Sequence, residues 1–288
     1  MISSFCLVAC ENKSTTTYFL SEKDCTTNWS LCTVFPNLEF EINDSEPIKI
    51  AILDSGINDE LTILKNRVTN SYNTLTNSTD TEDLFGHGTM VASIIAAEEN
   101  EGTVMGVNPT VELYDVQVLN DKGGGQISDV VEGIEWSVKK GVDIINLSFG
   151  FSKDEPALKD AINLALENNI IVVASAGNTL GLYTDYPAKY NGVISVSAID
   201  SELKKYIFAG IGKIDFVAPG VDVPVYNHLG EVEKQSGTSI ATAYTSGLIS
   251  ILLQNKKRES IITVELEETV KELGSAEKYG KGLIQLTN

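Results

Sequence analysis

Short apolar runs alternate along this chain with longer segments in which apolar residues recur at helical spacing. The runs predict buried strands at residues 48–53, 111–118, 142–148, 170–175 and 193–198. The spacing predicts helices at 90–97, 127–139, 155–167 and 240–253, a last helix at about 263–273, and short strands near 213–217, 223–226 and 231–234. This alternation predicts an α/β fold: a mostly parallel, twisted sheet with helices on both faces.

Polar stretches predict how the chain is divided. Residues 11–46 are rich in Thr, Ser, Asn and acidic residues, so we expect 1–46 to be an N-terminal extension on the surface of one domain, 47–288. A second polar stretch, about 70–83, predicts a loop. The longest apolar runs are far too short to span a bilayer, so the sequence predicts no transmembrane segment.

Composition narrows the classes of partner. The chain has 288 residues, 42% of them hydrophobic, which is enough for a large core. It carries 21 Lys and Arg against 40 Asp and Glu, a formal net charge of -19. Such a surface repels nucleic acid and anionic membranes and attracts cationic ligands at low salt. We therefore expect no nucleic-acid partner.

The cysteines lie together near the N-terminus, at Cys6, Cys10, Cys25 and Cys32. This excludes a disulfide framework for the predicted core, and without neighbouring His residues it does not favour zinc. A Cys25–Cys32 bridge would suit an exported protein, but a reduced pair is the simpler interpretation. Leu7 to Cys10 resembles a bacterial lipoprotein cleavage box, although no Lys or Arg precedes it.

A candidate nucleophile lies where a loop turns into an apolar helix, in the stretch from Gly237 to Tyr244. Ser239 there would have an exposed hydroxyl beside free backbone N–H groups and the positive end of the helix dipole. Both suit a reaction that builds an oxyanion. Taken alone, such a stretch is more typical of an ordinary helix cap.

Two further candidates lie at a strand end and at a helix start. Asp54 follows the strand 48–53, at the sheet edge where ligands bind in open α/β folds. His87 stands between two glycines, which let another backbone approach its ring. His228 is the only other histidine, and we expect it in a solvated turn.

Four blocks of sequence resemble those of the subtilases. Ile52–Ile57, Gly86–Ala92 and Gly237–Ala241 are similar to the family's three signature blocks, and Ala174–Asn178 to its oxyanion-hole segment. The order Asp…His…Ser is that of subtilisin. The resemblance runs from about Ile48 to the end of the chain.

The resemblance implies a three-layer subtilisin-like fold and a serine endopeptidase. Ser239 would attack a peptide carbonyl, His87 would take and later return its proton, and Asp54 would fix the His87 tautomer. Asn178 and the Ser239 backbone N–H would hold the oxyanion. No cofactor is required and no residue is assigned to a metal.

The same resemblance implies where an extended peptide binds. Gly123, Gly124 and Gly125 form one edge of the substrate site, and Ser148, Phe149 and Gly150 form the other. Asp185 would lie at the floor of the primary specificity pocket, which predicts cleavage after Arg or Lys. If the 179–184 loop shifts the register, Asp185 faces water instead.

The chain also departs from the family. Ala243 replaces the usual proline of the nucleophile block. Residues Glu98 to Val104 could supply oxygen ligands to structural calcium, but Ile63 falls near the place of the acidic partner. A tight calcium site is therefore not expected.

The 53 residues before Asp54 cannot hold both a prodomain and the usual start of the mature domain. The chain thus resembles intracellular subtilases, and among them enzymes that remove leader peptides from cationic lantibiotic precursors. We expect a cytoplasmic protein; the alternative is export with a lipid anchor at Cys10.

Three rival functions remain. The first is a general intracellular or surface subtilase of broad specificity. The second is a catalytically silent peptide-binding module, against which the intact candidate residues argue. The third, ranked last, is transpeptidation, because no predicted lid would exclude water from the acyl-enzyme.

Overall fold

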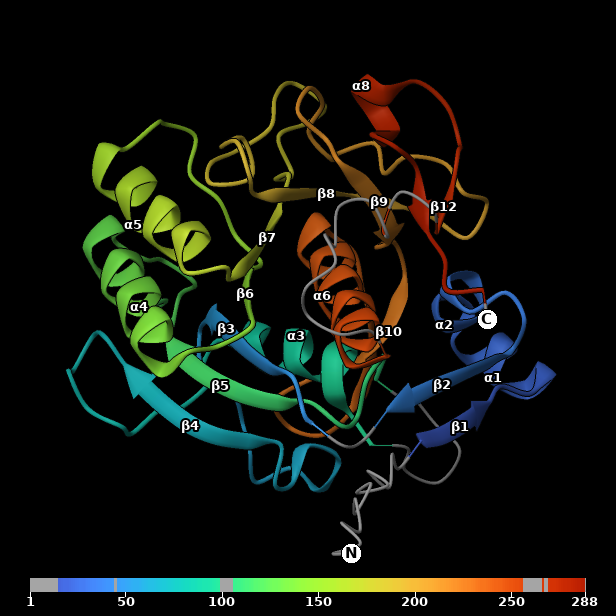
Figure 1. Ribbon diagram of the computed structural model, residues 1–288, viewed down its shortest axis with the longest axis horizontal. Helices are drawn as coiled ribbons and strands as arrows, with labels where there is room; N and C mark the ends of the chain where they lie inside the picture. The colour runs from blue at the N-terminus through green and yellow to red at the C-terminus, as the bar shows by residue number, and fades with distance from the viewer. Residues whose placement is uncertain (1–14, 44–45, 99–105, 256–265, 267–268, 288) are drawn as a thin grey trace, which may run out of the picture.

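A large central sheet organises the computed structural model, which describes residues 15–43, 46–98, 106–255, 266 and 269–287 (Figure 1). The described strands are β1 (Thr15–Phe19), β2 (Glu39–Asn43), β3 (Lys49–Asp54), β4 (Val68–Asn73), β5 (Glu112–Gln117), β6 (Ile144–Leu147), β7 (Ile171–Ser175), β8 (Ile194–Ile199), β9 (Phe216–Pro219), β10 (Val223–Tyr226), β11 (Val232–Gln235), β12 (Val270–Lys271) and β13 (Leu283–Ile284). The described helices are α1 (Glu22–Thr27), α2 (Trp29–Val34), η1 (Thr62–Leu64), α3 (His87–Ala96), α4 (Ile127–Lys140), α5 (Pro156–Glu167), α6 (Thr238–Asn255) and α8 (Ala276–Tyr279).

Nine strands form the sheet in the order β12-β13-β9-β8-β7-β6-β3-β5-β4. Every neighbouring pair is parallel except β12 with β13. Helices α3 and α6 share one hydrophobic core with one face of the sheet, and α4 and α5 share a second core with the other face. The predicted α/β class and its three-layer arrangement are confirmed.

Helix α6 lies at the centre of the molecule (Figure 1). All its residues from Ile240 to Gln254 are buried, which explains why its sequence carries no charged residue on any face. The helix runs without a break through Ala243. Helix α4 is amphipathic instead: Val130, Ile134 and Ser137 are buried, and Gly141 ends the helix in the left-handed conformation.

The strand register brings the functional segments to one rim. Asp54 at the end of β3 pairs with Gln117 at the end of β5, and Leu147 at the end of β6 pairs with Ala174 near the end of β7. Because these strands are parallel, the loops that follow them leave from the same edge of the sheet.

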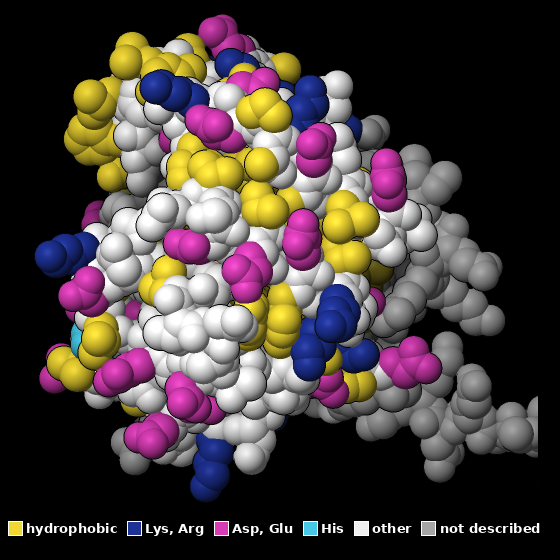
Figure 2. All heavy atoms as spheres, turned by 90° about the vertical axis from the view of Figure 1, so that its left-hand side faces the viewer, with side chains coloured by type: hydrophobic (Ala, Val, Ile, Leu, Met, Phe, Trp, Pro, Cys, Tyr) yellow, Lys and Arg dark blue, Asp and Glu magenta, His cyan; other side chains and the backbone are white. Residues whose placement is uncertain are grey.

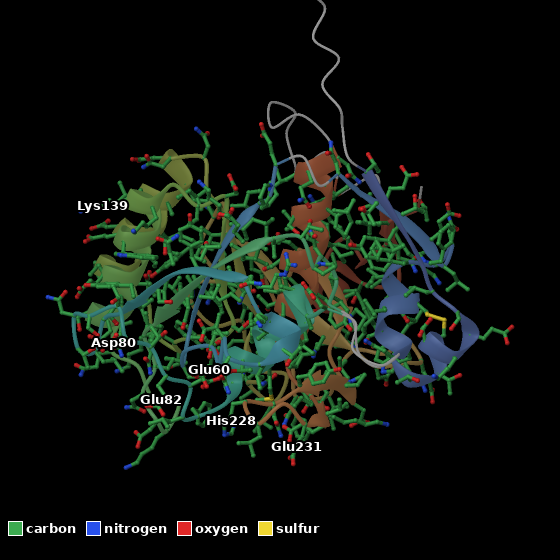
Figure 3. All side chains as sticks on the ribbon, turned by 90° about the horizontal axis from the view of Figure 1, so that it is seen from below. Glu60, Asp80, Glu82, Lys139, His228 and Glu231 are labelled. Atoms are coloured by element: carbon green, nitrogen blue, oxygen red, sulfur yellow. A yellow bond between two sulfur atoms is a disulfide. The ribbon has the colours of Figure 1, made fainter. Side chains whose placement is uncertain are left out.

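Residues 15–43 do more than cover the domain surface. Phe35, Phe40 and Ile42 are fully buried in the core that also contains α6. Cys25 and Cys32 form a disulfide between α1 and α2 (Figure 3), so the expectation of a reduced pair is wrong. The adjacency of two short helices brings the two sulfurs together, and the sequence alone did not reveal it.

Three element predictions were wrong in part. Residues 70–73 belong to β4, because an edge strand tolerates polar side chains. The helix expected from residue 90 begins at His87. Residues 270–271 form β12 rather than the end of a helix, because they pair with β13, and 256–265 and 267–268 lie outside the described residues.

Within the described part of the chain, no helix combines the length and the apolar character needed to cross a membrane.

Candidate active site

Asp54 and His87 form a close pair at the rim of the sheet. The Nδ1 atom of His87 lies 2.8 Å from Oδ1 and 3.0 Å from Oδ2 of Asp54. Asp54 is almost fully buried, and its Oδ1 also accepts a hydrogen bond from the Ser55 N–H at 2.8 Å. Burial lowers the pKa of His87, but the charge and hydrogen bond of Asp54 raise it more, so the net pKa lies above its usual value.

Glycines allow the two segments to approach each other. A Cβ atom on Gly88 would lie 2.1 Å from the carbonyl oxygen of Gly56, and a Cβ on Gly56 would lie 3.0 Å from the carbonyl carbon of Glu82. Gly86 has φ +90°, in the left-handed region that favours glycine. Larger residues would push His87 away from Asp54.

Asp83 is a residue of this region that the sequence analysis missed. Its side chain is buried and accepts hydrogen bonds from the Gly86 N–H at 2.6 Å, the Thr89 N–H at 2.8 Å, the Thr89 hydroxyl at 2.6 Å and the Ser55 hydroxyl at 2.7 Å. An acidic residue just before a helix is a capping signal, and that signal could have identified it.

Ser239 and Asn178 lie on the other side of the site. Ser239 is the second residue of α6, and Asn178 follows β7 in an exposed position. A Cβ on Gly237 would lie 3.1 Å from the Ser239 hydroxyl oxygen and 3.3 Å from the Asn178 amide nitrogen. Both groups therefore face the same space beside Gly237.

Thr238 fixes the orientation of the Asn178 amide. Its backbone N–H and its hydroxyl donate to the Asn178 Oδ1 atom at 3.2 and 3.3 Å. The same hydroxyl accepts a hydrogen bond from the Gly177 N–H at 3.2 Å. Because the amide oxygen is occupied, the NH₂ group is the end that remains for a ligand.

A buried network of hydrogen bonds between uncharged groups holds the backbone of Ser239. The Ser148 hydroxyl donates to the Ser239 carbonyl at 3.2 Å and accepts from the Asn146 amide at 2.9 Å. The Ser246 hydroxyl donates to the other end of that amide at 2.8 Å. Ser148 is thus a buried support, while Gly150, at the outer end of the same segment, is exposed.

Asp185 lies between Gly150, in the expected substrate-binding edge, and Gly177, in the expected oxyanion-hole segment. A Cβ on Gly150 would lie 2.6 Å from the Asp185 Cβ, and a Cβ on Gly177 would lie 2.1 Å from its Oδ2. Backbone hydrogen bonds of 2.7 and 2.8 Å between Phe151 and Tyr186 hold this arrangement. Burial raises the pKa of Asp185, and the carboxylate forms no ion pair with any described residue.

The glycine run lies beside the histidine. A Cβ on Gly123 would lie 2.6 Å from the Phe85 ring, whose centre is 6.4 Å from that of His87. Gly125 packs against Leu119, where a Cβ would approach to 2.5 Å. Gly124 lies against the Asn120 side chain. Residues 123–125 therefore form a loop that contacts the His87 segment through Phe85.

An acidic hollow of about 960 Å³ adjoins the His87 segment. Its lining contains no Lys or Arg, and its acidic residues are Asp59, Glu60, Asp80, Glu82, Asp83 and Asp121. Figure 3 shows Glu60, Glu82 and His228 along one edge of the molecule.

His228 corrects another expectation. It lies in the turn between β10 and β11, as expected, but it is only partly exposed, and its ring packs on Gly86, where a Cβ would lie 2.5 Å from Nδ1.

Most of the loop considered for calcium lies outside the described residues, 99–105 among them. Glu98 is described, and its carboxylate pairs with Arg67. Across the described ranges, no group of three or more His, Cys, Asp or Glu residues is arranged to hold a metal ion.

Comparison with known proteins agrees with this geometry. A model of the subtilase family matches residues 45–282. Subtilisin DY from Bacillus licheniformis is 37% identical over 250 residues, which cover 83% of this chain and 89% of that protein. Subtilisin Savinase from Lederbergia lenta is 34% identical over 240 residues, 82% of this chain and 88% of that protein. Subtilisin J from Geobacillus stearothermophilus is 36% identical over 250 residues, but these cover only 64% of its length.

Proposed function

We propose, from the premise that the chain belongs to the subtilase family and is a subtilisin-like serine endopeptidase, that Asp54, His87 and Ser239 are its catalytic triad. The 2.8 Å contact between His87 Nδ1 and Asp54 carries the proposal. It leaves Nε2 of the imidazole as the nitrogen that can take the proton of the nucleophilic hydroxyl. The position of Ser239 at the start of α6 supplies that hydroxyl.

The Ser239 oxygen attacks the carbonyl carbon of the scissile peptide bond while His87 takes the hydroxyl proton. His87 then gives this proton to the leaving amine, and an acyl-enzyme remains on Ser239. Water, deprotonated by His87, hydrolyses the ester and restores the hydroxyl. Asp54 holds the ring orientation and stabilises the imidazolium. The scheme uses no cofactor.

The oxyanion is held by the Asn178 amide and the Ser239 N–H. The occupied Oδ1 of Asn178 supports this role, because it directs the NH₂ group to the space beside the Ser239 hydroxyl. Donors fixed before the reaction begins need no reorganisation when charge develops.

The two histidines of the chain provide a matched test. We expect His87→Ala to abolish hydrolysis of a chromogenic peptide and His228→Ala to keep most of it, since only the His87 ring contacts Asp54. Equal activity of the two variants would contradict the triad. A wild-type protein that binds peptides without hydrolysing them would instead indicate the silent binding module.

We place Asp185 at the floor of the primary pocket, with cleavage after Arg or Lys. Its location between Gly150 and Gly177 supports the assignment, as does the lack of an ion pair with a described residue. A half-buried carboxylate of this kind is stabilised by a cationic substrate side chain.

Asp185→Ser tests the pocket. Turnover of Arg peptides should fall by about 10² or more relative to Leu peptides, because a charge-assisted contact is lost in a partly desolvated site. The matched control is Asp160→Ser on the exposed side of α5, which should leave the ratio unchanged. An unchanged ratio in Asp185→Ser would refute the assignment.

We propose a cationic precursor peptide as the substrate, cut at one site during leader removal. The acidic hollow beside His87 and the net charge of -19 support this choice. Figure 2 shows acidic side chains spread across a second face as well, so attraction over the whole surface adds to that of the hollow.

Mass spectrometry after digestion separates this substrate from the broad-specificity alternative. A single cut in a cationic precursor, with casein left intact, supports leader processing. Many cuts in casein would support a general subtilase. Cleavage of the cationic precursor should also slow as salt is added, whereas that of a neutral peptide should not.

The disulfide changes the proposal for location. Disulfides persist in oxidising compartments and are rare in the cytosol. The Cys25–Cys32 bond therefore supports the exported alternative over the cytoplasmic one. Alkylation of the protein as isolated from its natural host, followed by mass analysis of the 25–32 peptide, decides the point: labelled thiols would favour the cytoplasm.

A further inference from the structure

The first turn of α3 has no capping side chain at its own N-cap position. That residue is Gly86, which has no side chain to accept a hydrogen bond. Without partners, the N–H groups of this buried turn would be left unsatisfied, and such groups destabilise a helix start. His87 is the first residue of the helix, so the direction of its ring depends on how this turn is held.

Asp83 and Ser55 take over the capping. Asp83 accepts from the N–H groups of Gly86 at 2.6 Å and Thr89 at 2.8 Å. The Ser55 hydroxyl accepts from the Gly88 N–H at 3.0 Å. The cap of this helix is therefore built from residues outside it, one of which follows β3.

The same two residues join the helix to Asp54. The Ser55 hydroxyl donates to Asp83 Oδ1 at 2.7 Å, and the Ser55 N–H donates to Asp54 Oδ1 at 2.8 Å. Asp83 thus fixes the helix that carries His87 against the strand end that carries Asp54. All the groups in this link are buried.

We propose that Asp83 is a positioning residue for the reaction: it holds the first turn of α3 so that His87 meets Asp54, and its negative charge stabilises the imidazolium. The inference rests on the proposed function of His87 as the proton carrier. It concerns a residue that does not touch the substrate in the scheme above.

The charges around His87 agree with this role. Burial lowers the pKa of His87, Asp54 raises it through charge and hydrogen bond, and Asp83 raises it further through charge. Asp115 of β5 lies close enough for the negative charges of Asp83 and Asp59 to raise its pKa. His228 packs on Gly86 from the β10–β11 turn.

Asp83→Asn keeps the size of the side chain but removes its charge, so it tests the positioning role without changing the packing volume. We expect kcat to fall about 10- to 100-fold with KM changed little, because a small displacement of a catalytic group has effects of this size. The acid limb of the rate profile should also move to lower pH, because His87 loses a negative neighbour. The matched control is Asp160→Asn, an exposed carboxylate on α5 that does not line the hollow, which should alter neither.

Asp83→Glu and Ser55→Ala keep the test valid if Asp83→Asn fails to fold. Both disturb the geometry while keeping the carboxylate, so kcat should fall while the acid limb stays at the wild-type pH. An unchanged kcat in these variants, or an acid limb in Asp83→Asn that matches Asp160→Asn, would overturn the proposal. Activity of His87→Ala distinguishes the two failures: if that variant is active, the proposed function itself is wrong.

Discussion

The two sides of the active site are built from different kinds of hydrogen bond. On the histidine side, carboxylates accept most of the bonds: Asp54 holds His87, and Asp83 holds the first turn of α3. On the serine side, the hydrogen bonds join uncharged groups: Thr238 holds Asn178, and Ser148 holds the carbonyl of Ser239. The four supporting side chains named here are all buried.

In the proposed mechanism, the difference follows the charges that the reaction creates. A positive imidazolium forms on the histidine side, and fixed negative charges stabilise it. A negative oxyanion forms on the serine side, where a carboxylate would repel it and neutral donors stabilise it. The sign of each support therefore matches the sign of the transient charge beside it.

Removing the charge on the histidine side should have the largest effect. Asp54→Asn keeps the size of the side chain but favours the wrong tautomer of His87, so we expect kcat to fall about 10⁴-fold. Steady-state kinetics at pH 8 measure it. The control is Asp160→Asn on the exposed side of α5, which should keep wild-type kcat. A fall of less than tenfold in Asp54→Asn would contradict the role of its charge.

Removing the neutral donor on the serine side should have the next largest effect. Asn178→Ala should lower kcat about 10²–10³-fold, a range known from subtilisin itself, with little change in KM. Asn168→Ala, exposed at the end of α5, is the matched control. A rise in KM with unchanged kcat would mean that Asn178 binds the ground state instead.

One buried carboxylate near the histidine side, Asp115, lowers the stability of the fold. Burial raises the pKa of Asp115 to about 7, against the hydrogen bonds from Thr81 and Ile57, and its Oδ1 has no partner among the described residues. The folded state therefore keeps the Asp115 proton up to about pH 7, whereas the unfolded chain releases it near 3.8. Stability contributed by this group falls as pH rises through that window.

Asp115→Asn should remove this cost. At pH 8 the variant should unfold with a free energy a few kcal/mol above that of the parent, and the gain should shrink towards pH 4. Urea unfolding in a Ser239→Ala background, which prevents self-digestion, measures both. A gain that is the same at both pH values would show that the charge of Asp115 is not its cause.

The sequence alone could locate the candidate catalytic residues but not the residues that hold them in position. Asp54 and Asn178 follow apolar runs that form parallel strands of one sheet, β3 and β7, with β6 between them, so their common rim was predictable from pattern alone. Asp83 acts through contacts with Ser55 and Gly86, which depend on how two segments cross in space. The same limit applies to the Cys25–Cys32 bond, which depends on the geometry of α1 and α2.

The edge of the sheet was also hard to predict, for another reason. Strand β4 carries polar residues because it pairs on one side only, so its sequence lacks the apolar run that marked the central strands. The register of a strand is set by its partner, and local propensity does not contain it.

Labelling with a fluorophosphonate, followed by mass spectrometry of the digested protein, tests the central claim most directly. The account predicts one adduct, on the hydroxyl of Ser239, and its near disappearance in His87→Ala but not in His228→Ala. An adduct on another serine, or none under conditions that label Savinase, would contradict it.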